Sequence, residues 1–126
     1  MQKNVFGMEI ETCSENPLTG YFRDGSCNTS KDDTGMHTVC IIASKEFLEF
    51  SKMRGNDLST PLPQYNFNGI KPGDRWCLCA LRWVEAYNSN MAPQIVLEAT
   101  NEEALDIISL DMMLKFAYKK ESTSTQ

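Results

Sequence analysis

Short hydrophobic segments follow one another along this chain, some with the two-residue period of a strand and others with the 3.6-residue period of a helix. Residues 5–10 alternate weakly between apolar and polar side chains, which predicts an edge strand. Residues 37–43 are apolar and rich in β-branched side chains, so they predict a more regular strand. Residues 76–80 are apolar on both alternating faces, which is typical of a buried strand, and residues 95–97 predict a further short buried strand.

Helix signals lie between and after these strands. Ser44 is a predicted N-cap for a helix over residues 45–54, and a glycine follows it. Residues 81–88 carry a wide apolar side, residues 100–103 form a capping box, and Ser109 is a predicted cap for the last helix. This order predicts a small two-layer α+β domain, in which helices lie on one face of a short sheet.

Two irregular stretches, residues 11–36 and 55–75, separate the predicted elements. Both are longer than the roughly 12–15 residues at which loops become uncommon in compact domains. They contain aromatic residues and turn formers, so we expect two ordered loops that contact each other over the sheet. Residues 1–118 are predicted to form one domain, and residues 119–126 a frayed polar tail.

Net charge, histidine content and the length of the apolar runs exclude several classes of protein. The chain has 126 residues and a formal charge of −5, so we expect no general attraction to nucleic acid or to an anionic membrane. Its single histidine excludes any site that needs two histidines from one chain. The sequence has no apolar run of signal-peptide length and none near the ~18 residues of a membrane-spanning helix. We therefore expect a soluble, cytoplasmic protein.

The chain has five cysteines, and an odd number cannot pair completely within one chain. Because the cytoplasm keeps thiols reduced, we expect no disulfide. Zinc binding is one interpretation, but the spacing lacks a C-x₂-C knuckle, and burial as small hydrophobic side chains is favoured over any metal. A reactive thiol at Cys27, with His37 as its base, is another interpretation. The metal or thiol candidates are Cys27, Cys40, Cys77 and Cys79.

Polar residues in the long loops and at their junctions with strands are the ligand-binding candidates, because a rigid scaffold presents functional groups there. If buried, such groups must either pair with one another or face a ligand. They are Arg23, Asp24, His37, Asn56, Asp57 and Arg75. Asp33-Thr34-Gly35 matches the tripeptide of aspartic proteases, but those enzymes use two aspartates, so a turn is the favoured interpretation.

Several long strings of the sequence match one family. They include residues 13–28, residues 37–40, residues 54–61 and residues 72–80. In these strings the chain resembles the small, mainly bacterial family of domains of unknown function numbered 2237. The resemblance extends from about residue 3 to residue 115 and implies a compact two-layer α+β fold. It implies no activity.

Three hypotheses about function remain open. The first is a domain, with or without enzyme activity, that binds a small molecule or a metal between the long loops and the Cys77–Cys79 strand. The alternative is a non-catalytic module that binds a protein partner through its loop aromatics. The second alternative is a thiol-based redox-responsive protein.

Overall fold

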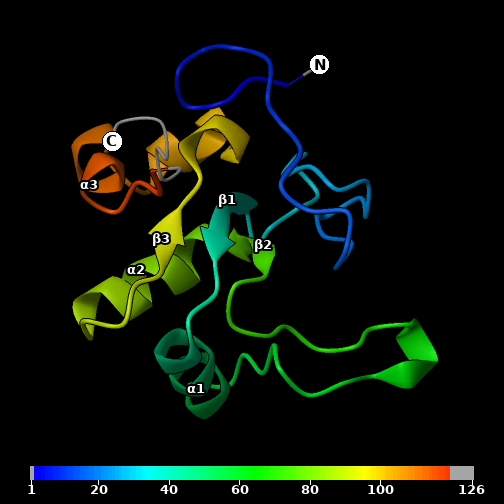
Figure 1. The fold of residues 1–126 in the computed structure, drawn as a ribbon. Helices are drawn as coiled ribbons and strands as arrows, with labels where there is room; N and C mark the ends of the chain where they lie inside the picture. Colours follow the sequence, from blue (N-terminus) through cyan, green and yellow to red (C-terminus); the bar gives the residue numbers. More distant parts are fainter. Residues whose placement is uncertain (1, 120–126) are drawn as a thin grey trace, which may run out of the picture.

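Three strands form a small antiparallel sheet at the centre of the molecule (Figure 1). The computed structural model describes residues 2–119. The strands are β1 (His37–Ile42), β2 (Arg75–Cys79) and β3 (Gln94–Ile95), and their order in the sheet is β2-β1-β3. The central strand is thus the one that the sequence predicts from its β-branched run.

The two faces of this sheet pack into different hydrophobic clusters. Val39, Ile41 and Leu78 belong to the main core, whereas Cys40 and Cys77 belong to a smaller cluster. The separation follows from the strand geometry, because successive side chains point to opposite faces. Each face of the sheet therefore needs a separate layer of the chain to shield its apolar side chains from water.

Helices cover the face that carries the main core. They are α1 (Lys45–Met53) and α2 (Ala80–Asn88), which contribute the buried Phe47 and Trp83. The sequence predicts both helices to within one residue at each end. Ser44 caps α1 as expected, because its Oγ accepts a hydrogen bond from the Phe47 N–H at 3.1 Å.

The remaining helices are short. They are α3 (Leu110–Lys115) and the 3₁₀ helices η1 (Pro63–Tyr65), η2 (Leu97–Ala99) and η3 (Glu102–Asp106). Ser109 caps α3, as predicted, by accepting from the Met112 N–H at 3.2 Å. The predicted capping-box helix is a 3₁₀ helix instead, and its cap is Asn101, which accepts from the Glu103 N–H.

The other face of the sheet is covered by the irregular N-terminal segment, which packs Cys13 and Cys27 against it. The strand predicted over residues 5–10 is absent. Asn4 instead organises a turn, in which its side-chain oxygen accepts from the N–H groups of Phe6 and Met8. Isolated bridges, among them Asn4 to Asn101, replace a continuous ladder.

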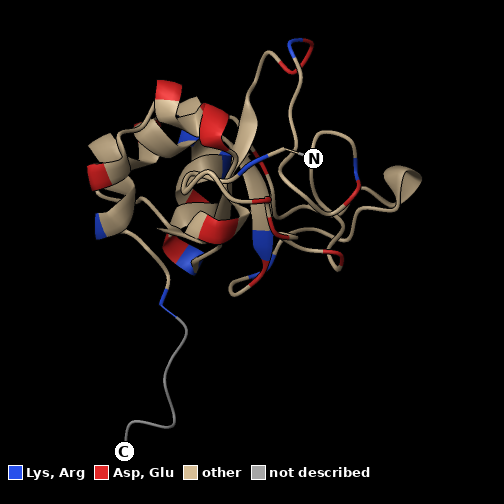
Figure 2. Ribbon diagram, turned by 90° about the horizontal axis from the view of Figure 1, so that it is seen from above, with Lys and Arg blue, Asp and Glu red and all other residues tan. Residues whose placement is uncertain are grey.

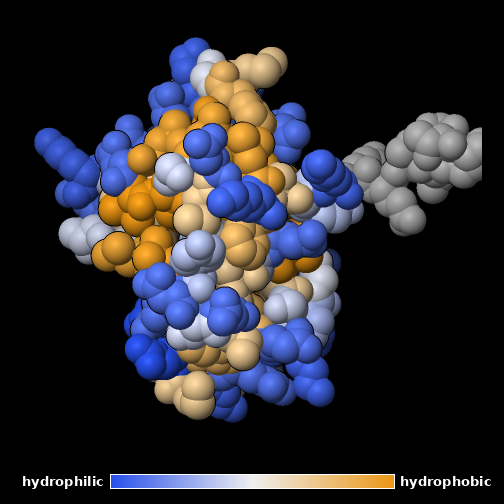
Figure 3. Space-filling view, turned by 90° about the vertical axis from the view of Figure 1, so that its left-hand side faces the viewer, coloured by the Kyte–Doolittle hydropathy of each residue, from blue (hydrophilic) through white to orange (hydrophobic). Residues whose placement is uncertain are grey.

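The result is a small α+β domain, as the sequence predicts. None of the helices that the structure describes is long and apolar enough to cross a membrane. The helical side exposes some hydrophobic side chains (Figure 3), and Leu105, Ile107 and Leu114 are among the exposed ones. The predicted tail lies outside the described residues apart from Lys119.

Candidate functional site

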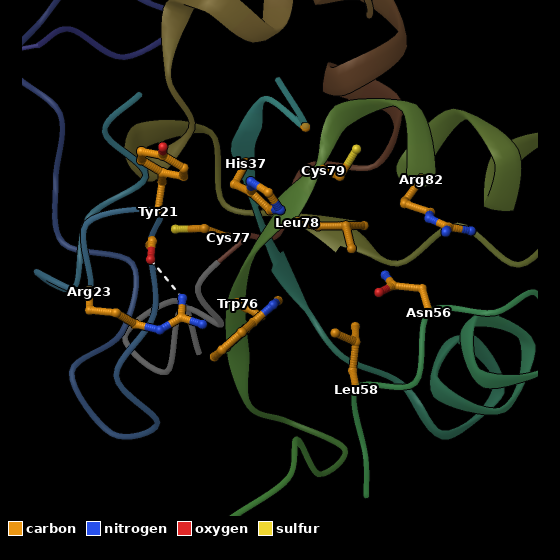
Figure 4. Close-up of a pocket in the computed structure, with 12 residues that line it drawn as sticks. Tyr21, Arg23, His37, Asn56, Leu58, Trp76, Cys77, Leu78, Cys79 and Arg82 are labelled. Carbon is orange, nitrogen blue, oxygen red and sulfur yellow. Dashed lines mark hydrogen bonds between the residues drawn. The ribbon is translucent and has the colours of Figure 1, made fainter. Parts of the chain in front are cut away.

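A cavity of about 600 Å³ lies between the two long loops and strand β2 (Figure 4). Residues of both loops line it, as do the strand and the first turn of α2. Its lining residues are Gly20, Tyr21, Arg23, Gly35, His37, Asn56, Leu58, Trp76, Cys77, Leu78, Cys79 and Arg82. This is the region in which the sequence analysis expects a site.

One edge of the cavity is formed by His37, which is held by Asp33. The Nδ1 atom of His37 lies 2.7 Å from Oδ1 of Asp33, whose side chain is only 1% exposed. The other carboxylate oxygen accepts from the His37 N–H and from the Thr29 hydroxyl, both at 2.9 Å. The turn expected at Asp33-Thr34-Gly35 is present, and it supplies this carboxylate.

Hydrogen bonding also sets the charge of Asp33. Burial raises the pKa of this carboxyl, but the hydrogen bonds from His37 and Thr29 outweigh burial, so its pKa is lowered from 3.8. An ionised Asp33 assigns the proton of a neutral His37 to Nδ1. Within the described part of the chain, Nε2 has no hydrogen-bond partner, so it is available to a ligand.

Gly35 allows the imidazole to take this position. A Cβ atom on Gly35 would lie 2.7 Å from Cε1 of His37, which is closer than real Cβ contacts come. The glycine therefore keeps room for the ring at the cavity edge.

Arg23 lies on another side of the cavity, above the ring of Trp76. Its guanidinium carbon is 5.3 Å from the ring centroid, which is within cation–π distance. Its Nη1 donates to the Gly20 carbonyl at 2.7 Å, the bond drawn in Figure 4. The remaining guanidinium donors have no protein acceptor among the described residues, so they can serve an anion.

Asn56 and Arg82 stand on the side opposite Arg23. The Asn56 backbone is fixed by two hydrogen bonds with Ser51, and its side-chain amide points toward the middle of the cavity (Figure 4). Arg82 is at the rim, where it donates to Glu85 and to the Arg54 carbonyl, both at 3.2 Å. The Arg82 guanidinium is thus partly occupied by protein acceptors, whereas the Asn56 side-chain amide has no hydrogen-bond partner among the described residues.

The cavity differs in charge from the rest of the molecule. The chain carries a net charge of −5, and Asp and Glu residues are spread over its helices and loops (Figure 2). None of the lining residues is acidic, whereas Arg23 and Arg82 are basic. The lining therefore favours a negatively charged occupant over a cation.

The structure brings together three of the six predicted ligand-binding candidates, namely Arg23, His37 and Asn56. Asp24 instead accepts from the Ser26 N–H and from the Asn28 amide, so it shapes its own loop. The other two candidates, Asp57 and Arg75, also do not line this cavity.

Asp57 stabilises its own loop. Its carboxylate accepts from the backbone N–H groups of Ser59 and Thr60 and from the Thr60 hydroxyl at 2.6 Å. The hydrogen bond from the Thr60 hydroxyl is the largest cause of its lowered pKa. Arg75 lies elsewhere, with its guanidinium carbon 5.5 Å from the centroid of the Tyr118 ring.

Tyr21, Trp76 and Arg82 are not among the predicted ligand-binding candidates, although all three line the cavity. Trp76 belongs to an unbroken apolar run, and Arg82 lies on the polar side of a helix. Neither pattern distinguishes a lining residue from an ordinary one.

Four of the five cysteines form disulfides, Cys13 with Cys40 and Cys27 with Cys77. The prediction of no disulfide is therefore wrong. That prediction rested on the expected compartment. Each bond joins a loop cysteine to a strand cysteine, and nothing local in the sequence shows this packing.

The disulfides also change the interpretation of the thiols. Cys27 is bonded, so it is not a free nucleophile beside His37. Cys79 is the free cysteine and is half-buried. It faces His37 across the strand pair, but its sulfur points away from the imidazole (Figure 4). Within residues 2–119, which include all five cysteines, no thiol is therefore paired with His37.

Comparison with known proteins identifies a family but no function. A search of curated proteins found none that matches. The model of a family described as an uncharacterised protein conserved in bacteria, DUF2237, matches residues 3–117. This match covers nearly the whole domain, and the chain therefore belongs to the DUF2237 family.

Proposed function

We propose that this protein binds a small organic anion in the cavity between its long loops and β2. The observation that carries the proposal is the convergence of Arg23, His37 and Asn56 on one space that no acidic residue lines among those the structure describes. Each of the three has hydrogen-bonding capacity that is not used within the described part of the chain. Arg23 and Asn56 offer unused donors, which favour a ligand that accepts hydrogen bonds, whereas the free Nε2 of a neutral His37 accepts a hydrogen bond from a hydroxyl group or a water molecule.

The volume and the apolar lining support an organic ligand. About 600 Å³ lies within the range of small-molecule sites. The ring of Trp76 forms part of the wall and Tyr21 forms another part, so flat surfaces lie next to the charged groups. A carboxylate attached to a planar apolar group suits both features.

Benzoate is a suitable probe, because benzamide matches it in size and lacks its charge. In a proton–nitrogen NMR titration we expect benzoate to shift the Trp76 indole signal and the Asn56 amide signals. The buried Trp83 indole, which donates to the Pro93 carbonyl, is the internal control. Benzamide should bind at least about tenfold more weakly, which corresponds to 1.4 kcal/mol.

Variants connect this binding to the cavity. Arg23→Gln should weaken benzoate binding, whereas Arg75→Gln, an arginine outside the lining, should leave it unchanged. Equal affinity for benzoate and benzamide would disprove the proposal. So would benzoate shifts that occur away from the cavity.

A protein-interaction role is the second candidate, because exposed loop side chains favour it. Tyr65 is 75% exposed, Phe22 is 51% exposed and Leu18 is 48% exposed. Leu18 and Tyr65 also border a second cavity of about 970 Å³. Tyr65→Ala should weaken partner binding without affecting benzoate, which separates the two candidates. The cytoplasmic location expected from the sequence stays a prediction.

A further inference from the structure

Four cysteine sulfurs meet on the face of the sheet that the N-terminal segment covers. Cys40 and Cys77 are directly opposed on β1 and β2. The Sγ atoms of Cys13, Cys27 and Cys77 all lie within 4.8 Å of one another, and Sγ of Cys40 is bonded to that of Cys13. All four residues are between 0% and 4% exposed. The four sulfurs therefore form one buried cluster.

We propose that the reduced protein binds one Zn²⁺ through these four cysteines, and that the two disulfides are the oxidised form of the same site. Zinc takes four thiolates at about 2.3 Å, which places neighbouring sulfurs roughly 3.8 Å apart in a tetrahedron. The unbonded pairs among Cys13, Cys27 and Cys77 are already near this spacing, whereas the Cys40 sulfur, which is bonded to that of Cys13, has to turn toward the other two. The two bonded pairs need to separate by only about 2 Å after reduction.

The strand cysteines are held in place independently of the sulfur–sulfur bonds. The Cys40 N–H donates to Oγ1 of Thr100 at 3.1 Å, and the Cys77 N–H donates to Oγ1 of Thr19 at 2.8 Å. Both threonines are fully buried. Neither these hydrogen bonds nor the strand pairing involves the sulfur atoms.

The loop cysteines have comparable supports. The Cys13 N–H donates to the Gly25 carbonyl at 2.8 Å, so the two ends of the loop are tied together. The Cys27 carbonyl accepts from the buried Asn101 amide at 3.1 Å. These backbone hydrogen bonds favour the positions of the loop cysteines over the sheet, so a bound Zn²⁺ stabilises an arrangement that the reduced chain can re-form.

Four protein ligands and no open position are typical of a structural zinc site, and burial among Ile10, Val96 and Ala99 fits that class. The fifth cysteine, Cys79, is not part of this cluster. It lines the anion cavity, as Cys77 also does, but it takes part in neither disulfide, so it provides a matched control.

Interconversion of the two forms is a four-electron step that requires an oxidant such as a peroxide. Two hydrogen peroxide molecules react with the zinc-bound tetrathiolate, and each takes two electrons from two thiolates as its O–O bond breaks. The products are two disulfides, one free Zn²⁺ and four hydroxide ions. Charge balances, since the tetrathiolate site carries −2 and the released zinc and hydroxides also sum to −2.

The test uses the full chain, reduced with a phosphine under anaerobic conditions and then freed of reductant. Titration with Co²⁺ should saturate at one equivalent and give the intense thiolate charge-transfer and tetrahedral d–d bands of a tetrathiolate. Zn²⁺ should displace the cobalt, and two equivalents of peroxide should release the zinc to a chromogenic chelator. The oxidised protein should bind neither metal.

Two variants locate the site. Cys79→Ser should keep one equivalent of metal and the tetrathiolate spectrum, whereas Cys27→Ser should lose that spectrum. If the reduced metal-free protein unfolds, one equivalent of Zn²⁺ should restore its circular dichroism. The proposal is overturned if the reduced wild type gives no tetrathiolate spectrum, or if only Cys79→Ser abolishes it. Benzoate binding by the oxidised protein is a separate property, and its failure does not bear on this result.

Discussion

Removal of the Cys27–Cys77 disulfide should destabilise the oxidised protein substantially. The bond joins residues 50 apart in the sequence. In the chain-entropy model, a crosslink over a loop of this length restricts the unfolded chain by about 4 kcal/mol at 25 °C. The perturbation is the double variant Cys27→Ala and Cys77→Ala. Alanine is preferred because serine would place hydroxyl groups at two buried positions.

Two further effects limit this estimate. The loop closed by Cys27–Cys77 overlaps the one closed by Cys13–Cys40, so the contributions of the two disulfides are not additive. The hydrogen bond from the Cys77 N–H to Thr19 uses the backbone and survives the substitution. We therefore expect a loss of about 2–5 kcal/mol in the free energy of unfolding.

Urea unfolding at 25 °C without reductant measures this loss. Trp83, buried in the main core, is a suitable fluorescence reporter. The m-value should rise, because an unfolded chain with one crosslink fewer exposes more surface. The control is Cys79→Ala, which removes a half-buried thiol that has no bond and should cost less than about 1 kcal/mol.

A loss below about 1 kcal/mol in the double variant would refute the reasoning. So would a loss equal to that of Cys79→Ala. Either result would mean that hydrogen bonds and apolar contacts hold the N-terminal segment on the sheet without the crosslink.

Three further predictions follow from single contacts. Asp33→Asn should lower stability at pH 7 by about 1–3 kcal/mol in urea unfolding, because a buried acceptor of three hydrogen bonds is altered. The pKa of Asp33 is lowered in the folded protein, so its contribution is fully present above pH 3.8 and fades below it; the difference from wild type should shrink at pH 3. Asp57→Ala should lower the melting temperature at pH 7, and an unchanged value would contradict its role in its loop. Gly69→Ala should cost more than Gly55→Ala in the same assay, because both have positive φ but only at Gly69 would a Cβ overlap the Ser59 carbonyl.

The parts of the fold that depend on local contacts could be predicted from the sequence. Ser44 and Ser109 cap their helices through bonds to residues three positions ahead, so a four-residue pattern contains the relevant information. The central strands could be predicted for a similar reason, since an apolar run needs burial whatever its neighbours are.

The parts that depend on distant partners could not. Asn4 lies opposite Asn101, and Thr100 accepts from the Cys40 N–H, so each contact joins segments far apart in the sequence. The candidate site is of the same kind. Arg23 and Asn56 could be selected as polar loop residues, but only the fold shows that they face one cavity and that Arg75 does not.

The covering layers on the two faces of the sheet are stabilised in different ways. The sequence predicts that the cysteines are buried as small hydrophobic side chains, but it does not predict that four of them also form crosslinks. The helical face buries large side chains such as Phe47 and Trp83, which come from periodic apolar helices. The N-terminal segment has no such period, and four of the seven buried residues in its cluster are cysteines. Apolar burial alone is small there, so crosslinks or a shared metal must supply the stability that helices supply on the other side.

Reduction without metal should therefore loosen the layer over Cys40 and Cys77 before the helical layer. In hydrogen exchange, backbone amides of residues 13–27 should lose protection at reductant concentrations that leave α2 unchanged. Simultaneous loss of protection in both layers would show that the sheet couples them into one cooperative unit.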